Sequence, residues 1–192
     1  MDATYYFDPV CPFTWRTSRW LVSVAPSRDV TVRWRPFSLS ILNGGETPEE
    51  YRPMMEASAK ALRLVAALAA DRRDDTIGTF YTELGTRTHD AGAALTEEIV
   101  LASAEAAGVA DAKAILEDTS WDSSVRESHD EAFNSAGPDI GSPVLAIEGA
   151  PRGVHGPIID EVPPLDEALA IWDAVLPLAR STTFFELKRG RQ

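Results

Sequence analysis

The first 35 residues contain an apolar strand, a helix and a second strand in close succession, and this order restricts the fold more than any other feature. Residues 3–7 predict a short, largely buried strand. Pro12 favours the first position of a helix running to about Val24, where Pro26 is expected to end it. Apolar and polar residues alternate over 30–35, which is typical of a half-buried strand. Because two strands joined by one helix pair in parallel, we predict an α/β fold.

Residues 47–137 carry helical patterns and no convincing strand. They begin with Thr47-Pro48-Glu49-Glu50, which has the capping threonine, first-turn proline and acidic residue of a helix N-terminus. Further patterns place helices at about 48–72, 76–89, 96–107, 111–118 and 121–136. We therefore predict an all-helical insertion domain at 47–137, between the two parts of one α/β domain at 1–46 and 138–192.

The chain returns to β structure after this helical stretch. Residues 144–147 predict a strand, and residues 154–159 predict its partner in a hairpin. A last helix is expected after Pro163-Pro164, with Pro177 kinking or ending it. Residues 184–189 are expected to add a helical turn, with Phe184-Phe185 anchoring the tail. The order β-α-β, helices, β-β-α is that of a thioredoxin-like domain with a helical insertion.

Composition excludes several classes of function. Cys11 is the one cysteine among 192 residues, which rules out an internal disulfide, a cysteine-rich zinc site and self-contained dithiol chemistry. The net charge of −12 disfavours nucleic acids and anionic membranes as partners. No secretory signal and no membrane-spanning apolar run is visible, so we expect a cytoplasmic protein. His129 and His155 show no ligand spacing with Cys11, and we predict no metal.

The position of Cys11 suggests reactive chemistry. As the N-cap of a helix, its side chain would meet unpaired N–H groups and the positive end of the helix dipole, and both favour a thiolate. The alternative is a small, buried and inert side chain. Thr14 lies where dithiol enzymes carry a second cysteine, and its hydroxyl can donate to the sulfur but cannot attack a mixed disulfide. Arg16 would add positive potential.

The segment Phe7-Asp8-Pro9-Val10-Cys11-Pro12-Phe13, with Thr17-Ser18-Arg19-Trp20-Leu21 behind it, resembles the DsbA family of thioredoxin-fold proteins. It is most similar to the actinobacterial mycothiol-dependent nitroreductase-like group. Further matching stretches lie at Ser38-Leu39 with Leu42-Asn43, Gly85-Thr86-Arg87 with His89, Gly141-Ser142-Pro143-Val144 and Phe184-Phe185-Glu186-Leu187-Lys188-Arg189.

The resemblance implies a thioredoxin fold with an inserted helical domain, and a cleft between the two. It also implies a cis proline at Pro143, opposite a Cys11 thiolate that works with a low-molecular-weight thiol, either mycothiol or glutathione. Family members often have Cys-Pro-x-Cys, whereas here Thr14 replaces the second cysteine. An intramolecular disulfide is therefore impossible in this chain.

Seven residues besides Cys11 and Thr14 are candidates for substrate binding, and most have a structural alternative. Asn43 also suits a turn, Phe13 and Tyr51 also suit packing, and His89 with Arg87 also suits a polar contact between domains. The remaining candidates are Pro12, Ser142 and Pro143.

Three functions remain open. The leading hypothesis is a thiol-dependent oxidoreductase in which a second thiol molecule resolves the Cys11 mixed disulfide, acting on disulfides or on small electrophilic or nitro compounds. A second is a kappa-type thiol transferase or isomerase, in which the cofactor thiol is the nucleophile and Cys11 or Thr14 stabilises it. A third is a non-catalytic binding module. The chain is expected to be a monomer or a homodimer.

Overall fold

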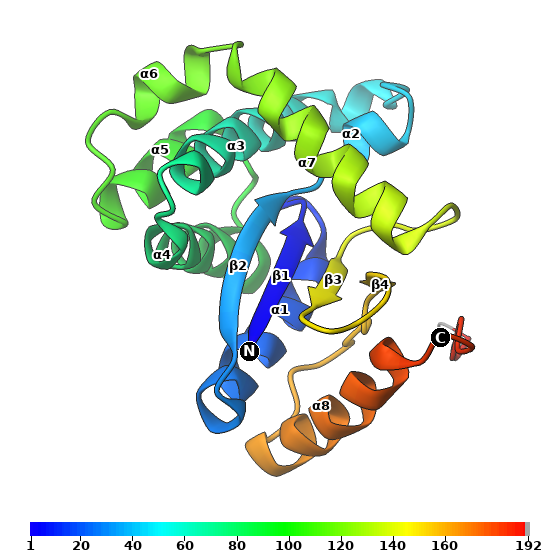
Figure 1. Cartoon of the computed structure of the whole chain (residues 1–192). Helices are drawn as coiled ribbons and strands as arrows, with labels where there is room; N and C mark the ends of the chain where they lie inside the picture. The colour runs from blue at the N-terminus through cyan, green and yellow to red at the C-terminus, as the bar shows by residue number, and fades with distance from the viewer. Residues whose placement is uncertain (191–192) are drawn as a thin grey trace.

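A computed structural model describes residues 1–190 and contains a four-stranded mixed sheet in the order β2-β1-β3-β4 (Figure 1). The central strand β1 (Asp2–Phe7) is parallel to β2 (Thr31–Pro36) and antiparallel to β3 (Val144–Ile147). The short strand β4 (Val154–His155) pairs antiparallel with β3. The crossover between β1 and β2 is helix α1 (Pro12–Arg28). The predicted strand–helix–strand unit is therefore confirmed.

Helices cover both faces of the sheet. On one face, α1 packs against α8 (Leu165–Arg180), where the Trp20 indole donates to the Ala168 carbonyl at 3.0 Å. On the other face lies α7 (Trp121–Ala136), which contacts all four strands. The alternation of side chains along β1 accounts for these two layers, because every second residue of a strand faces the same side.

The remaining helices form the insertion between β2 and β3 (Figure 1). They are the short α2 (Leu39–Leu42), the 3₁₀ turn η1 (Glu49–Tyr51), α3 (Arg52–Ala70), α4 (Asp74–Gly85), the π-helical turn η2 (Thr86–Asp90), α5 (Glu97–Ala106) and α6 (Ala112–Glu117), followed by α7. This arrangement is the predicted thioredoxin-like fold with a helical insertion. The exact domain boundaries at 46/47 and 137/138 stay a prediction.

An aromatic cluster attaches the insertion to the sheet. The ring of Tyr81 on α4 stacks on Phe7 of β1 with centroids 4.1 Å apart, and meets Trp15 edge-on at 5.4 Å and Trp34 at 5.8 Å. All four rings are buried. Edge-to-face and offset pairs of this kind add to the free energy gained by burying the rings themselves.

Two predicted helix boundaries were wrong. Helix α1 continues through Pro26 to Arg28, and it ends where Asp29 adopts a left-handed conformation with φ 51° and donates its N–H to the Ala25 carbonyl. The end of α1 is therefore set by a C-cap and not by the proline. Thr47 does not cap the next long helix, because η1 intervenes and α3 begins only at Arg52, with Pro53 in its first turn.

Three expectations for the C-terminal part were also wrong. Strand β4 has two residues instead of six, and it ends at a cis Gly156-Pro157 bond, where Pro157 has no N–H to continue a ladder. Pro177 does not end the last helix, since α8 continues past it to Arg180, and a kink at Pro177 stays a prediction. Residues 184–189 form no helical turn, and Phe185 is 84% exposed, so it does not anchor the tail. The last two residues of the predicted range 138–192 lie outside the described residues.

Gly85, at the end of α4, permits the close approach of Trp15. A Cβ at this position would overlap the Trp15 indole ring. We expect Gly85→Ala to lower the free energy of unfolding by about 1–3 kcal/mol, although alanine favours a helix over glycine. Thermal or denaturant unfolding measures this. Gly78→Ala in the same helix is the matched control, because its Cβ would lie 3.1 Å from the Trp34 indole nitrogen and needs a smaller shift. Equal losses in both variants would contradict the explanation.

Candidate active site

Cys11 lies directly after β1, at the end of a tight turn. The turn comprises Asp8, Pro9, Val10 and Cys11, and the Cys11 N–H donates to the Asp8 carbonyl at 3.2 Å. Aspartate at the first and proline at the second position are favoured in such turns. Cys11 then has the extended conformation of an N-cap, with φ −86° and ψ 117°, and Pro12 opens α1. Cys11 therefore occupies the predicted N-cap position and is partly exposed, but its side chain makes no capping hydrogen bond.

The sulfur faces the segment before β3. Cys11 Sγ donates to the Ser142 carbonyl at 3.7 Å, and the Ser142-Pro143 peptide bond is cis. Both Ser142 and Pro143 are buried. This place is the carboxyl end of the parallel pair β1–β2, the edge where open α/β sheets usually bind their ligands.

Thr14 is not available to the sulfur in the way expected. Its side chain is buried, and its hydroxyl is hydrogen-bonded to the Ser142 hydroxyl at 2.8 Å instead of to Cys11. The Thr14 carbonyl accepts from the Tyr5 hydroxyl at 2.7 Å. Thr14 therefore connects α1 to the cis-proline segment, a role that follows from tertiary contacts and not from its spacing to Cys11.

Asp8 belongs to the site and was missed by the sequence analysis. Its carboxylate is 1% exposed and accepts from Val10 N at 3.0 Å, Leu39 N at 2.8 Å and the Ser58 hydroxyl at 2.5 Å. Burial raises the pKa of Asp8, and the three donors oppose that rise. A signal was present: an acidic residue directly after a largely buried, aromatic-rich strand is a candidate for burial with partners.

His89 contacts the same turn from the insertion. Its Nε2 lies 2.8 Å from the Pro9 carbonyl, and because a carbonyl only accepts, Nε2 carries the proton. The ring stacks on Trp15, whose indole donates to Asp90 at 2.8 Å. Burial lowers the pKa of His89. His89 thus supports the backbone next to Cys11.

A second histidine holds the chain after β2. The Ser38 N–H donates to Nδ1 of the buried His129 at 3.3 Å, so Nδ1 is unprotonated. The His129 ring lies between Phe37 and Phe133. Burial lowers the pKa of His129, with Asp130 raising and Arg126 lowering it to a lesser extent.

The other predicted binding residues lie farther out. Pro12 is exposed, and Phe13 is partly buried beneath the guanidinium of Arg16, which lies 5.6 Å from its ring centroid. Asn43 ends α2 and is exposed, and Tyr51 is 50% exposed at the start of α3. The structure therefore brings Cys11, Thr14, Ser142, Pro143 and His89 together around one turn. The hydrogen bonds described for Asn43 and Tyr51 connect them to their own segment.

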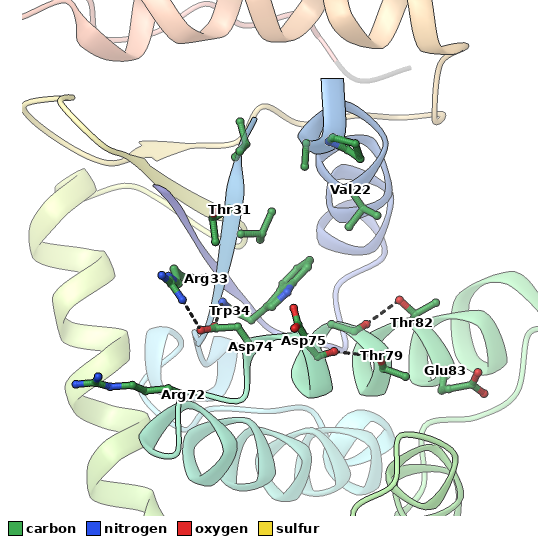
Figure 2. A pocket seen from close by; sticks show the side chains of 15 residues that line it. Val22, Thr31, Arg33, Trp34, Arg72, Asp74, Asp75, Thr79, Thr82 and Glu83 are labelled. Atoms are coloured by element: carbon green, nitrogen blue, oxygen red, sulfur yellow. Dashed lines mark hydrogen bonds and ion pairs between the residues drawn. The ribbon is translucent and has the colours of Figure 1, made fainter. Parts of the chain in front are cut away.

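A large groove lies away from Cys11. It encloses about 840 Å³ between α1, α4 and the outer edge of β2, and Figure 2 shows Val22 of α1 on one side and Thr82 of α4 on the other. Inside the groove, the Asp74 carboxylate accepts from the Trp34 N–H of this edge strand at 2.9 Å and pairs with Arg33. Cys11 is not among the residues that line the groove, so the groove is separate from the thiol site.

Within residues 1–190, no three His, Cys, Asp or Glu side chains lie together as a metal site requires. None of the helices in the described part of the chain is long and apolar enough to cross a bilayer.

The state of His129 predicts a pH dependence of stability. The pKa of His129 is lower in the folded than in the unfolded protein. Neutral His129 therefore stabilises the fold at pH values above its unfolded pKa of about 6.5, and this stabilisation is lost as the pH falls from there through the lower pKa of the folded state. His89 shifts in the same direction. We expect the melting temperature to fall between about pH 7.5 and about pH 5.5. His129→Gln, which accepts a hydrogen bond without titrating, should make this fall smaller, and an unchanged fall would contradict the assignment.

Known proteins with the same fold carry different activities. The 2-hydroxychromene-2-carboxylate isomerase structure has a TM-score of 0.61 at 13% identity, covering 94% of this chain and 97% of that one. The cytosolic disulfide reductase DsbM from Pseudomonas aeruginosa has a TM-score of 0.57 at 15% identity, covering 93% and 100%. At such low identity these matches establish the DsbA-like thioredoxin fold alone.

Sequence comparison identifies the family. The protein Rv2286c of Mycobacterium tuberculosis is 29% identical over 194 residues, covering 97% of this chain and 81% of the relative. The model of the Rv2466c-like family, described as mycothiol-dependent nitroreductase Rv2466c, matches residues 10–189. This match covers nearly the whole chain and confirms the resemblance seen around Cys11. The chain therefore belongs to the Rv2466c-like family of DsbA-related proteins.

Proposed function

We propose that this protein is a cytoplasmic thiol-dependent oxidoreductase whose nucleophile is Cys11. The observation that carries the proposal is the placement of the one cysteine at the N-cap of α1, partly exposed and 3.7 Å from the Ser142 carbonyl of a cis-proline segment. Unpaired N–H groups at a helix N-terminus stabilise a thiolate, which is the form that attacks disulfides. The membership in the Rv2466c-like family supports this proposal.

The reaction proceeds in two thiol–disulfide exchanges. The Cys11 thiolate attacks one sulfur of a small disulfide, forms a mixed disulfide and releases the other half as a thiolate. A thiolate of a second small thiol then attacks the non-protein sulfur, regenerates the Cys11 thiolate and releases a new disulfide. Overall, the substrate disulfide and one small thiol give one released thiol and one new disulfide between the incoming thiol and the other half of the substrate, so electrons and protons balance. A further exchange with another small thiol completes the reduction of the substrate to two thiols and leaves the two small thiols as one disulfide.

The partner thiol must come from another molecule, because the chain has no second cysteine. The family description favours mycothiol, and glutathione has the same chemistry. With a nitro compound as the acceptor, two thiols would be oxidised to a disulfide while the nitro group becomes a nitroso group and water. Phe13, in the first turn of α1 after Cys11, offers a ring to a flat substrate, and the guanidinium of Arg16 lies over that ring and pairs with Asp160.

The alternative is a kappa-type transferase or isomerase, in which the bound cofactor thiol is the nucleophile. The hydrogen bond from the Thr14 hydroxyl to Ser142 favours Cys11 over Thr14 as the side chain that would stabilise the cofactor thiolate in this alternative.

Replacing the nucleophile tests the proposal directly. We expect Cys11→Ser to lower the rate of disulfide reduction by at least about a hundredfold, because a neutral hydroxyl is a weak nucleophile. Intact mass after incubation with oxidised mycothiol or glutathione should show one thiol adduct on the wild type and none on the variant. Turnover retained in Cys11→Ser would favour the transferase, and a wild type without adduct or turnover would favour a non-catalytic module.

A second cysteine should change the intermediate. Thr14 lies one turn along α1 from Cys11, at the position of the resolving cysteine in dithiol enzymes. We expect Thr14→Cys to attack the Cys11 mixed disulfide, so that the thiol adduct no longer accumulates and the protein loses two hydrogens instead. Mass spectrometry distinguishes the two products, and Thr14→Ser is the control that keeps a hydroxyl. A stable adduct on Thr14→Cys would show that position 14 cannot reach the mixed disulfide.

A further inference from the structure

Asp8 forms hydrogen bonds through every polar group that it has. Its N–H donates to the Ser142 hydroxyl at 3.0 Å, and its carbonyl accepts from the Cys11 N–H at 3.2 Å. These two bonds join the residue to the cis-proline segment and to the cysteine. The backbone of Asp8 therefore connects the two parts of the chain between which the Cys11 sulfur lies.

The side chain of Asp8 reaches two further segments. Oδ1 accepts from Val10 N in the same turn and from the hydroxyl of Ser58 on α3, and Oδ2 accepts from Leu39 N at the start of α2. Ser58 is 1% exposed, so this contact is inaccessible to water that could replace it. One carboxylate thus joins the Cys11 turn to a helix of the insertion and to the chain that leaves β2.

The insertion contacts this turn at a second point. His89 of η2 donates to the Pro9 carbonyl, one residue after Asp8. The turn is therefore held by α3 through Asp8 and by η2 through Pro9, while Cys11 remains partly exposed at its end. Two polar contacts from the insertion, one buried and one partly buried, thus meet on one four-residue turn.

We propose that Asp8 is a positioning residue through which helix α3 of the insertion sets the place of Cys11 against Ser142-Pro143. Its hydrogen bonds to Ser58 and Leu39 fix the position of the turn. Its hydrogen bonds to Cys11 and Ser142 then fix the position of the sulfur relative to the cis-proline segment. The inference rests on the proposed function for its chemical meaning. In this proposal the insertion influences the reactivity of Cys11, in addition to covering the sheet.

A carboxylate suits this position because it only accepts hydrogen bonds, and all three side-chain partners of Asp8 are donors. In Asp8→Asn the amide nitrogen would face a backbone N–H in either orientation, that of Val10 or that of Leu39. One buried donor would lose its acceptor, so the substitution changes the bonds with almost no change in size. Ser58→Ala is gentler, since it removes only the hydrogen bond from α3 to Asp8 and changes no residue of the turn itself.

The experiment measures the reaction of Cys11 with an excess of dithiodipyridine as a function of pH, in the full-length protein. We expect Ser58→Ala to react about tenfold more slowly than the wild type and Asp8→Asn more slowly still, because small displacements of a reacting group have large effects on rate. The slowing should persist in both variants across the whole pH range measured, because the substitutions act on the placement of the sulfur. Ser103→Ala is the matched control, since it removes a buried hydroxyl from α5 of the same insertion, where it donates to the Ile99 carbonyl.

Hydrogen exchange separates positioning from reactivity. In Ser58→Ala the peptide that contains residues 8–11 should exchange faster than in the wild type, and in Ser103→Ala it should not. Thermal unfolding establishes that each variant is folded under these conditions. Wild-type rates and exchange in both Ser58→Ala and Asp8→Asn would overturn the inference, as would an equal slowing in Ser103→Ala.

The two proposals fail in different ways. A wild-type Cys11 that reacts no faster than a cysteine in an unfolded peptide contradicts the proposed function. Hydrogen exchange of residues 8–11 still decides the positioning inference in that case. Conversely, a reactive wild type whose rate is unaffected by Ser58→Ala and Asp8→Asn leaves the proposed function intact and removes the role of α3.

Discussion

The burial of one carboxylate is the constraint on which the arrangement around Cys11 depends. A charged group taken out of water is strongly unfavourable unless donors replace the lost hydration. Asp8 obtains these donors from its own turn, from the start of α2 and from α3. Three segments that are distant in sequence therefore meet at one carboxylate, which belongs to the residue three positions before the N-cap of α1.

Apolar packing complements this polar contact. Tyr81 brings α4 against the strand β1 and the helix α1 through Phe7 and Trp15, and Gly85 leaves room for the Trp15 ring. Burial of these rings stabilises the docked insertion, and the hydrogen bonds of Asp8 and His89 add contacts with fixed directions. The hydrophobic effect is non-directional and cannot by itself fix the position of a sulfur atom.

Several features were predictable because they arise from local patterns. The apolar run of β1, the proline at the start of α1 and the alternation in β2 identified the parallel unit and the capping position of Cys11. Proline did not predict where the helices end, because α1 continues through Pro26 and α8 through Pro177. Tertiary packing can stabilise a helix in which a proline near the C-terminus removes one backbone hydrogen bond. Ser58 carried no signal, as nothing distinguishes one serine in an alanine-rich helix.

The sequence by itself determined the fold class, the strand that leads into Cys11 and the absence of a second thiol, because each follows from residue type and short-range periodicity. Only the tertiary structure decided which groups surround the sulfur. It placed the Thr14 hydroxyl on Ser142, His89 on the Pro9 carbonyl and Asp8 between α3 and the turn. The physical reason is that a buried polar group takes whichever partner the packed chain brings within hydrogen-bond distance, and that partner can come from any part of the sequence.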